Sequence, residues 1–340
     1  MPQTLKPEEN GMSVRNLSWR LLGCSLALTG WTGLGTGGAL AADAFPIKTI
    51  RWIVPYPPAG TTDILARILA QRMSETIGQQ VVVDNRPGAG NNIGTEIAIR
   101  SNPDGYTIFL VNPANAINAT LYPKLPFDFL RDMAPAGGIV RVPNVMEVTM
   151  SLPVKSIPEF IAHAKKTPGK VILASSGAGT SVHLSGELFK MMTGTDLTHV
   201  PYKGAGPALI DLIGGQVHVM FDNMPSSIEH IRNGKLRALG VTTAKRSALL
   251  PDVPTVAESV PGYEASAWFG MGVPKGTPAD VVARLNREMN NAIADPKVRA
   301  RLTDLGGDSI AGTPAEFWKV HAEETAKWAK VVKASGARVE

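Results

Sequence analysis

The chain has 340 residues, a formal net charge of +5 and one cysteine, Cys24. A single cysteine excludes a disulfide framework and any cysteine-based zinc or iron–sulfur centre. Because 44% of the residues are hydrophobic, the chain can bury real cores, which excludes disorder, and its length predicts two domains. The basic charge is spread out, without a run of five like charges, so nothing predicts binding to nucleic acid.

The first 41 residues have the pattern of a secretory signal peptide. Arg15 and Arg20 precede an uncharged stretch over 21–40, and Ala39-Leu40-Ala41 supplies the small residues of a cleavage site. We therefore expect cleavage after Ala41. Two alternatives stay open. The uncharged stretch is long enough to be a membrane anchor, although six of its residues are glycine. Cys24 could instead carry a lipid, although no apolar stretch leads into it.

Strand and helix signals alternate along the rest of the chain. The apolar run 50–54 predicts a buried strand, Pro57-Pro58-Ala59-Gly60 ends it, and Thr61-Thr62-Asp63 offers caps for a helix that stops at Gly78. By the same signals we expect further strands at 81–83, 106–111, 171–174, 217–221 and 238–242, and helices that open at Ser156, Ser181, Ser226, Thr277 and Thr313. This alternation predicts an α/β fold with largely parallel sheets covered on both faces.

Two loops have the composition of ligand-binding turns. Tyr56–Asp63 and Ser175–Ser181 each lead from an apolar strand into a helix and consist mostly of small or hydroxyl-bearing residues. In open α/β sheets ligands bind beyond the carboxyl ends of the strands, and helix N-termini present free N–H groups. Neither loop contains Lys or Arg, so an anion bound there would be held by amides and hydroxyls. Ordinary tight turns between strand and helix are the alternative interpretation.

Catalytic signatures are weak. The six histidines form neither H-x-H nor H-E-x-x-H, and no nucleophile elbow or dinucleotide fingerprint occurs, so we expect no metal and no cofactor. Asp63 could act as a general base or as the acidic partner of a helix dipole. Asp222 follows an apolar strand, where its side chain would either project toward a cleft or form an Asx turn.

Eight short motifs occur in a fixed order along the mature chain. They are Ile53–Asp63, Asn85–Gly90, Asp104–Thr107, Ala174–Gly177 with Gly179-Thr180, His199–Gly204, Phe221–Asn223, Gly234–Ala238 and Trp268–Gly270. Through these motifs the chain resembles, over about 45–338, the Bug-type receptors, the solute-binding proteins of the tripartite tricarboxylate transporter family. Each motif alone is weak, whereas eight in the same order are specific.

The resemblance implies a fold like that of type II periplasmic binding proteins, in which two crossover strands join two α/β lobes. Lobe one would comprise 45–145 plus 266–340 and lobe two 146–265, with the crossings near 144–148 and 267–270. The ligand would lie in the cleft between the lobes. The implied protein is a periplasmic monomer, not an enzyme, that closes on a small organic carboxylate and presents it to membrane transporter subunits.

The resemblance also assigns ligand-binding residues. They are Tyr56, Pro57, Pro58, Ala59, Gly60, Thr61, Thr62, Asp63, Asn115, Ser175, Ser176, Gly177, Gly179, Thr180, Tyr202, Asp222, Trp268 and Phe269. Ala59 stands where the family often has glycine, Asn91 replaces a common glycine, and Asn115 stands where many members carry histidine. These departures leave the identity of the carboxylate open. Two alternatives remain, a sensory receptor without a dedicated transporter and a secreted hydrolase or isomerase that uses Asp63 or Asp222 as its base.

Overall fold

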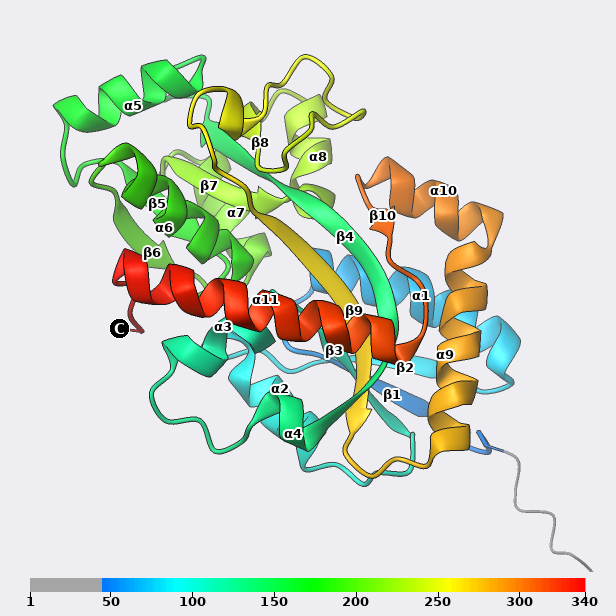
Figure 1. Cartoon of the computed structure of the whole chain (residues 1–340). Helices are drawn as coiled ribbons and strands as arrows, with labels where there is room; N and C mark the ends of the chain where they lie inside the picture. Colours follow the sequence, from blue (N-terminus) through cyan, green and yellow to red (C-terminus); the bar gives the residue numbers. More distant parts are fainter. Residues whose placement is uncertain (1–44, 340) are drawn as a thin grey trace, which may run out of the picture. The chain divides into compact units, whose positions relative to one another are not determined.

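A computed structural model describes residues 45–339 of the chain, so the predicted signal peptide lies outside the described residues. The elements, in chain order, are β1 (Ile50–Val54), α1 (Thr61–Ile77), β2 (Val81–Asn85), the 3-10 turn η1 (Ala89–Asn91), α2 (Asn92–Ile99), β3 (Thr107–Val111), α3 (Pro113–Leu121), α4 (Phe129–Asp132), β4 (Met133–Thr149), α5 (Ile157–Lys166), β5 (Ile172–Ser175), α6 (Ser181–Thr193), β6 (Thr198–Pro201), α7 (Ala205–Ile213), β7 (Val219–Asn223), α8 (Met224–Arg232), β8 (Leu236–Val241), the 3-10 turn η2 (Val256–Glu258), β9 (Ser266–Pro274), α9 (Ala279–Ala294), α10 (Pro296–Asp304), β10 (Asp308–Ser309) and α11 (Pro314–Ser335). Figure 1 gives their arrangement. None of the helices within 45–339 is long and apolar enough to cross a bilayer.

The α/β class that the sequence predicts is confirmed, with one correction to the sheet. The strand order is β2-β1-β3-β9-β4-β7-β5-β6, and β8 and β10 also pair with β4. The outer pairs are parallel, as expected, but β9 and β4 at the centre run antiparallel to their neighbours. The long strand β4 pairs with β9 over Met133–Pro143 and with β7 over Asn144–Val148, so it carries the chain through both halves of the sheet.

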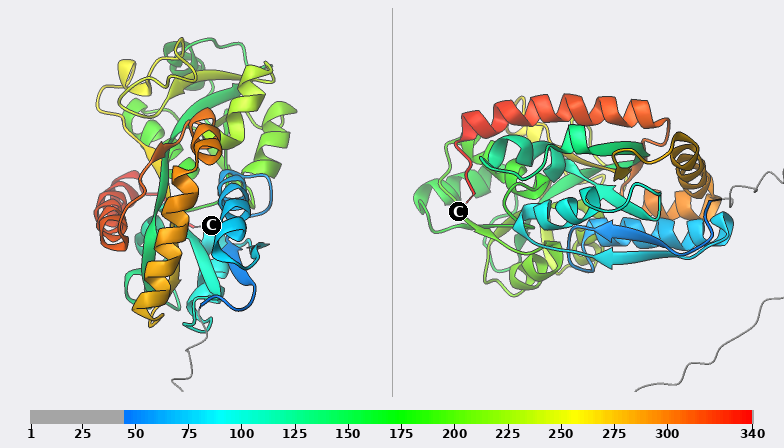
Figure 2. Two further views of the ribbon diagram at one scale, coloured as in Figure 1. Left: turned by 90° about the vertical axis from the view of Figure 1, so that its right-hand side faces the viewer. Right: turned by 90° about the horizontal axis from the view of Figure 1, so that it is seen from below.

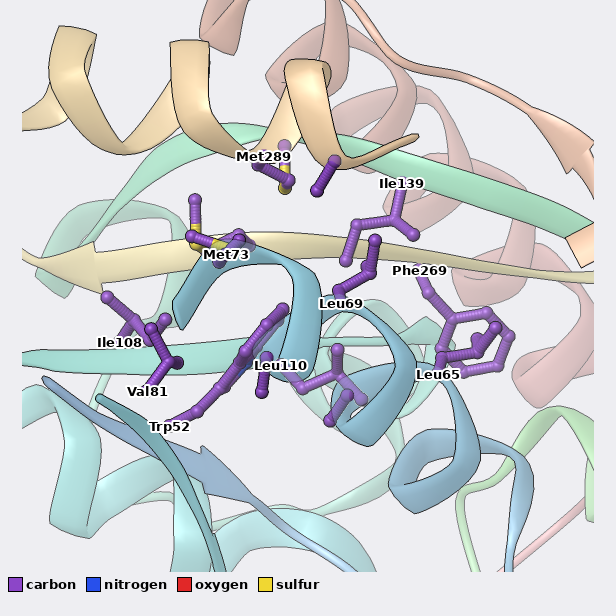
Figure 3. Packing of buried hydrophobic residues seen from close by; sticks show 14 of the residues in the cluster. Trp52, Leu65, Leu69, Met73, Val81, Ile108, Leu110, Ile139, Phe269 and Met289 are labelled. Atoms are coloured by element: carbon purple, nitrogen blue, oxygen red, sulfur yellow. The ribbon is translucent and has the colours of Figure 1, made fainter. Parts of the chain in front are cut away.

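The first half of the sheet packs against the apolar face of α1. Leu65, Leu69 and Met73 recur every four residues and are almost fully buried, which places them on one side of the helix. They meet Trp52 of β1 and Phe269 of β9 in the cluster that Figure 3 draws. Burial of each such side chain stabilises the fold by about 1.5–3 kcal/mol.

Helix α11 packs on both halves of the sheet. Figures 1 and 2 show that it crosses β4 and β9 obliquely, and near its start Phe317 packs against Trp268 of β9. Eleven residues on, Trp328 belongs to a second core cluster that includes Phe160 of α5 and Phe221 of β7. One helix therefore contributes side chains to two separate core clusters.

The predicted helix starts at Ser156, Ser181 and Thr313 are confirmed. Ser156 caps α5 by accepting the N–H of Glu159 at 3.3 Å, and Thr313 forms a capping box with Glu316 at the start of α11. The expected start at Ser226 is wrong, because α8 begins at Met224. The fixed φ of the following proline suits the first turn of a helix, so the helix starts before the serines.

Two further starts are also corrected. The residue that caps α1 is Gly60, not one of the threonines that follow it. Pro278 occupies the cap position of α9, which begins at Ala279. Strand β7 extends to Asn223, which places Asp222 inside the strand and not in the turn after it.

Candidate functional site

A cavity of about 30 Å³ lies where the N-terminal ends of five helices meet, with room for about two waters. The helices are α1, α3, α6, α7 and α8, and β9 adds Phe269. The twelve lining residues, none of them charged, are Tyr56, Gly60, Thr61, Thr62, Asn112, Pro113, Ser176, Thr180, Ser181, Ala205, Asn223 and Phe269. Residues far apart in the sequence thus surround one small uncharged space.

The five helix starts differ in how their free N–H groups are satisfied. Asn112 caps α3 and Thr180 caps α6 through their side chains. No side chain caps α1, α7 or α8, whose cap residues are Gly60, Gly204 and Asn223. An uncapped helix start carries unpaired donors and about half a positive charge. The cavity is therefore electropositive through backbone alone, which suits a small anion.

The loop before α1 is fixed by hydrogen bonds to Asp63, which does not line the cavity. Its carboxylate accepts the N–H of Ala59 at 3.1 Å, the Asn85 amide at 2.9 Å and the Arg67 guanidinium at 2.9 Å. Ala59 has a φ of 70°, a left-handed conformation that costs a non-glycine residue about 1 kcal/mol. The three hydrogen bonds fix this strained turn.

The same contacts set the charge of Asp63. Burial alone would raise its pKa, but the hydrogen bonds from Arg67, Asn85 and the Ala59 N–H outweigh burial and hold the pKa below its ordinary value. Asp63 is thus ionised at neutral pH and fully engaged. Of its two predicted roles, the geometry favours the structural one over that of a general base.

The loop before α6 is held by neutral groups. The Ser175 hydroxyl lies 2.7 Å from Nε2 of His199, and the N–H of Gly179 donates to Nδ1 of His183 at 3.2 Å. The two imidazole rings stack, with their centroids 4.1 Å apart. Burial is the main cause that lowers the pKa of His183 to about 3 and that of His199 to about 4, so both rings are uncharged at neutral pH.

Asp222 does not line the cavity, whereas Asn223, the next residue in the sequence, does. It is fully buried, and Ser226 and Ser227 of α8 donate to its Oδ2. Ser227 also lies 2.8 Å from Oε1 of Glu147, a second fully buried acid on β4. Burial raises the pKa of both acids, that of Asp222 to about 6. The hydroxyl of Thr61, which does line the cavity, is 3.0 Å from that of Ser226.

The predicted binding residues occupy several places. Seven line the cavity: Tyr56, Gly60, Thr61, Thr62, Ser176, Thr180 and Phe269. Gly177 and Tyr202 line an adjoining cavity of about 350 Å³, and Asn115 lines a separate one of about 390 Å³ beside His321. The remaining residues, Pro57, Pro58, Ala59, Asp63, Ser175, Gly179, Asp222 and Trp268, line none of these three cavities.

Trp268 and its neighbour illustrate why one position of a motif can mislead. Successive side chains of a strand point to opposite faces, and here Phe269 faces the cavity. Trp268 is fully buried on the other face against Phe317 and His321, at ring distances of 5.9 and 5.3 Å. It belongs to the core under α11.

Sequence reasoning missed three lining residues outright, Asn112, Pro113 and Ala205. It named Ser181 only as the end of a loop and Asn223 only as the end of a motif. A signal existed for the first pair. Asn-Pro directly after an apolar strand combines a favoured cap residue with a proline in the first helical turn. Ala205 carries no comparable signal, because only the topology brings its helix start to the cavity.

The adjoining cavity extends the site outward. It shares Tyr56 and Ser176 with the inner cavity and adds Lys203, the only cationic residue among those of 45–339 that line it. Within residues 45–339, no three His, Cys, Asp or Glu side chains come together as a metal site would require. The arrangement thus combines an inner anion pocket with an outer chamber that carries one positive charge.

The fold and this site define a class of solute-binding receptors, and sequence comparison identifies the family. Residues 65–337 match the model of the tripartite tricarboxylate transporter family receptor, so the chain belongs to this family. Protein BugT of Bordetella pertussis is 39% identical over 308 residues, which are 90% of this chain and 94% of BugT.

Solved structures agree with this assignment. Rpa4515 of R. palustris, solved with adipate, is 40% identical with a TM-score of 0.85 over 87% of this chain and all of that one. MatC from Rhodopseudomonas palustris, solved with bound malate, is 31% identical with a TM-score of 0.81 over 85% of this chain and all of MatC. The periplasmic binding protein BugD is 35% identical with a TM-score of 0.84 over 87% and 100% of the two chains.

Proposed function

We propose that this protein is a periplasmic receptor that captures a small organic dicarboxylate and presents it to a membrane transporter. The observation that carries the proposal is the meeting of five helix starts, three without a side-chain cap, around a cavity with no charged lining residue. A carboxylate accepts hydrogen bonds from such N–H groups without a salt bridge. The adipate and malate bound to the two relatives are of this chemical class.

The two adjoining cavities suggest how a dicarboxylate would lie. One carboxylate would take the inner cavity, and the chain would pass between Tyr56 and Ser176 into the outer chamber. There the ammonium of Lys203 could meet the second carboxylate. Lys203→Gln should therefore weaken the binding of adipate several-fold and leave hexanoate, which lacks that second group, unchanged.

Capture would act by closure of the two predicted lobes. Residues from both lobes line the cavity, Thr61 from one and Ser176 from the other. The facing backbones are close: a Cβ added at Gly90 would lie 2.2 Å from the carbonyl oxygen of Ala178. A ligand that contacts both sides binds the closed form better and so shifts the population toward it.

Calorimetry with adipate and malate tests the proposal. We expect one site per chain and a Kd that rises less than about tenfold from low to high salt, because capture by amides involves no exposed ion pair in the inner cavity. Solution scattering should give a smaller radius of gyration with ligand. Recovery of the ligand chemically unchanged distinguishes a receptor from a hydrolase or isomerase. Failure of both acids to bind would overturn the proposal.

A further inference from the structure

We propose that capture of a carboxylate in the inner cavity takes up one proton, which Asp222 holds and which Ser226 relays as a hydrogen bond to Thr61. The inference rests on the proposed function and adds a proton as a second ligand of the same site. Its basis is a continuous chain of contacts from Glu147 through Ser227, Asp222 and Ser226 to the cavity wall.

With Asp222 ionised, the hydroxyl protons in this series of hydrogen bonds point away from the cavity. Ser226 and Ser227 both donate to Oδ2 of Asp222. The oxygen of Ser226 then accepts from Thr61 across 3.0 Å. The Thr61 hydroxyl has only one proton, so it would offer the cavity lone pairs. A carboxylate, which only accepts hydrogen bonds, meets an acceptor there.

Protonation of Asp222 reverses the direction of these hydrogen bonds. A proton on Oδ2 would be donated to the Ser226 oxygen, which frees the Ser226 hydroxyl from Oδ2. Its two remaining acceptors are the carbonyl oxygen of Asn223 at 2.9 Å and Thr61 at 3.0 Å, and a carboxylate that accepts from Thr61 favours donation to Thr61. The Thr61 proton can then turn into the cavity toward the ligand. No bond other than the O–H bond on Asp222 forms, and the proton comes from solvent. A carboxylate in the cavity therefore favours the protonated acid by accepting this hydrogen bond and by like-charge repulsion of the ionised form.

The surroundings of Asp222 supply no cation that would oppose this. Glu147, on the neighbouring strand β4, is itself an acid. Within the described chain, neither its Oε2 nor Oδ1 of Asp222 has a hydrogen-bond partner. The charged groups of the neighbouring elements are engaged elsewhere: Asp63 with Arg67 on α1, Lys190 with Glu187 on α6, Asp211 with Tyr202 on α7, Glu229 with Arg232 on α8, and Arg237 of β8 with the carbonyls of Leu152 and Val154. Burial lowers the pKa of His183 on α6 to about 3 and also lowers that of His230 on α8.

The direction of the pH effect follows. Burial raises the pKa of the Asp222 carboxyl to about 6, and it raises that of Glu147 well above its ordinary value. Near neutral pH Asp222 is therefore mostly ionised. Because the complex favours protonated Asp222, its pKa rises on binding, so affinity should increase as the pH falls from 8 to 6.

The experiment is calorimetry of the full mature protein with adipate and malate at pH 6.0–8.0, a range in which carboxylic acids of ordinary pKa remain ionised. Two buffers of different ionisation enthalpy count the protons taken up. We expect uptake of a substantial fraction of one proton between pH 6 and 7, and a Kd about five- to tenfold higher at pH 8 than at pH 6.

Variants assign the effect. Asp222→Asn cannot take up a proton but can donate through its amide, so it should bind tightly at every pH without proton uptake. Ser226→Ala breaks the relay and should bind more weakly, with only the smaller pH dependence that like-charge repulsion causes. Glu324→Gln, which alters another buried acid that accepts from Trp328 at 2.9 Å, is the matched control and should behave like the parent.

The outcomes are distinct. Binding with neither proton uptake nor pH dependence overturns this inference and leaves the receptor function intact. Unchanged uptake in Ser226→Ala overturns the relay, because repulsion alone would then suffice. No binding of either acid at any pH overturns the proposed function and this inference with it. The parent measurement decides the first point even if a variant fails to fold.

Discussion

The loops before α1 and α6 have similar composition but satisfy their helix starts in opposite ways. In the second loop Thr180 accepts the N–H of His183 at 3.1 Å and donates to the carbonyl of Gly177 at 2.8 Å. In the first, the cap residue is Gly60, which has no side chain to accept anything. One loop has therefore used its hydrogen-bonding capacity within the protein, and the other keeps it for a ligand.

The groups that hold the loops differ in charge. An ionised carboxylate, Asp63, holds the first loop, whereas two neutral imidazoles, His183 and His199, hold the second. Acid therefore acts on them over different ranges. An unfolded histidine takes up a proton below about pH 6.5, whereas an unfolded aspartate does so only below about pH 3.9.

The largest expected effect is the loss of stability in acid. The folded-state pKa values of His183 and His199, about 3 and about 4, lie below the unfolded value. The stabilisation is present above pH 6.5 and is lost as the pH falls toward 4, by up to about 1.4 kcal/mol per pH unit for each ring. Urea unfolding between pH 7 and 4.5 should record a fall of several kcal/mol.

The double variant His183→Gln, His199→Gln should make this pH dependence shallower. His321→Gln is the control for the position of the buried ring relative to the loops. Burial also lowers the pKa of His321 to about 3, but that ring stacks on Phe129 under α11, away from both loops. The variant His321→Gln should therefore also make the pH dependence of stability shallower, but it should leave ligand affinity unchanged. An unchanged profile in the double variant would mean that other groups govern acid unfolding.

Asp63→Ala should give the next largest effect. It leaves the N–H of Ala59 and the guanidinium of Arg67 without this acceptor, and the Asn85 amide with only the carbonyl of Tyr56. The free energy of unfolding should fall by about 2–3 kcal/mol. Carboxylate binding should be lost with it, because the turn that presents the α1 start is released. Denaturant unfolding and calorimetry measure the two effects. Glu323→Ala, at an exposed ion pair with Lys319, should change stability by less than about 0.5 kcal/mol.

Local patterns predicted much of this molecule. The alternation of strand and helix signals predicted the α/β class, and Ser156 and Thr313 were correctly identified as caps. The antiparallel centre of the sheet could not be predicted, because β4 and β9 lie more than 100 residues apart and their pairing has no local signal.

The site divides in the same way. The contiguous loops around Thr61 and Ser176 could be found because strand, turn and helix start adjoin in the sequence. Ala205 and Asn223 could not, since only the packing of α7 and α8 brings their helix starts to the cavity. The apolar run ends at 221, which predicts Asp222 beyond its strand, whereas β7 continues through two polar residues to Asn223 and α8 follows directly.

A smaller effect should follow from removal of the cap on the second loop. Thr180→Ala deprives the N–H of His183 of its acceptor and should cost about 1 kcal/mol of stability. If that start has only a structural role, the Kd for adipate should change less than about threefold. Thermal unfolding and calorimetry decide this. Loss of binding as severe as in Asp63→Ala would mean that both helix starts hold the ligand.

The smallest effect on stability, and the sharpest on binding, should come from Gly60→Ser. Gly60 has a φ of −87°, which any residue adopts, and a Cβ there would lie 3.8 Å from that of Ala205, an ordinary contact. The serine hydroxyl would cap α1 and stabilise the protein by a few tenths of a kcal/mol. It would also occupy N–H groups that the carboxylate needs, so the Kd should rise at least about tenfold, as loss of about 1.4 kcal/mol of binding implies. Gly60→Ala adds the same Cβ without an acceptor and should slightly destabilise the protein yet bind normally. Equal loss of binding in both variants would assign the effect to bulk and contradict capture by the free amides of α1.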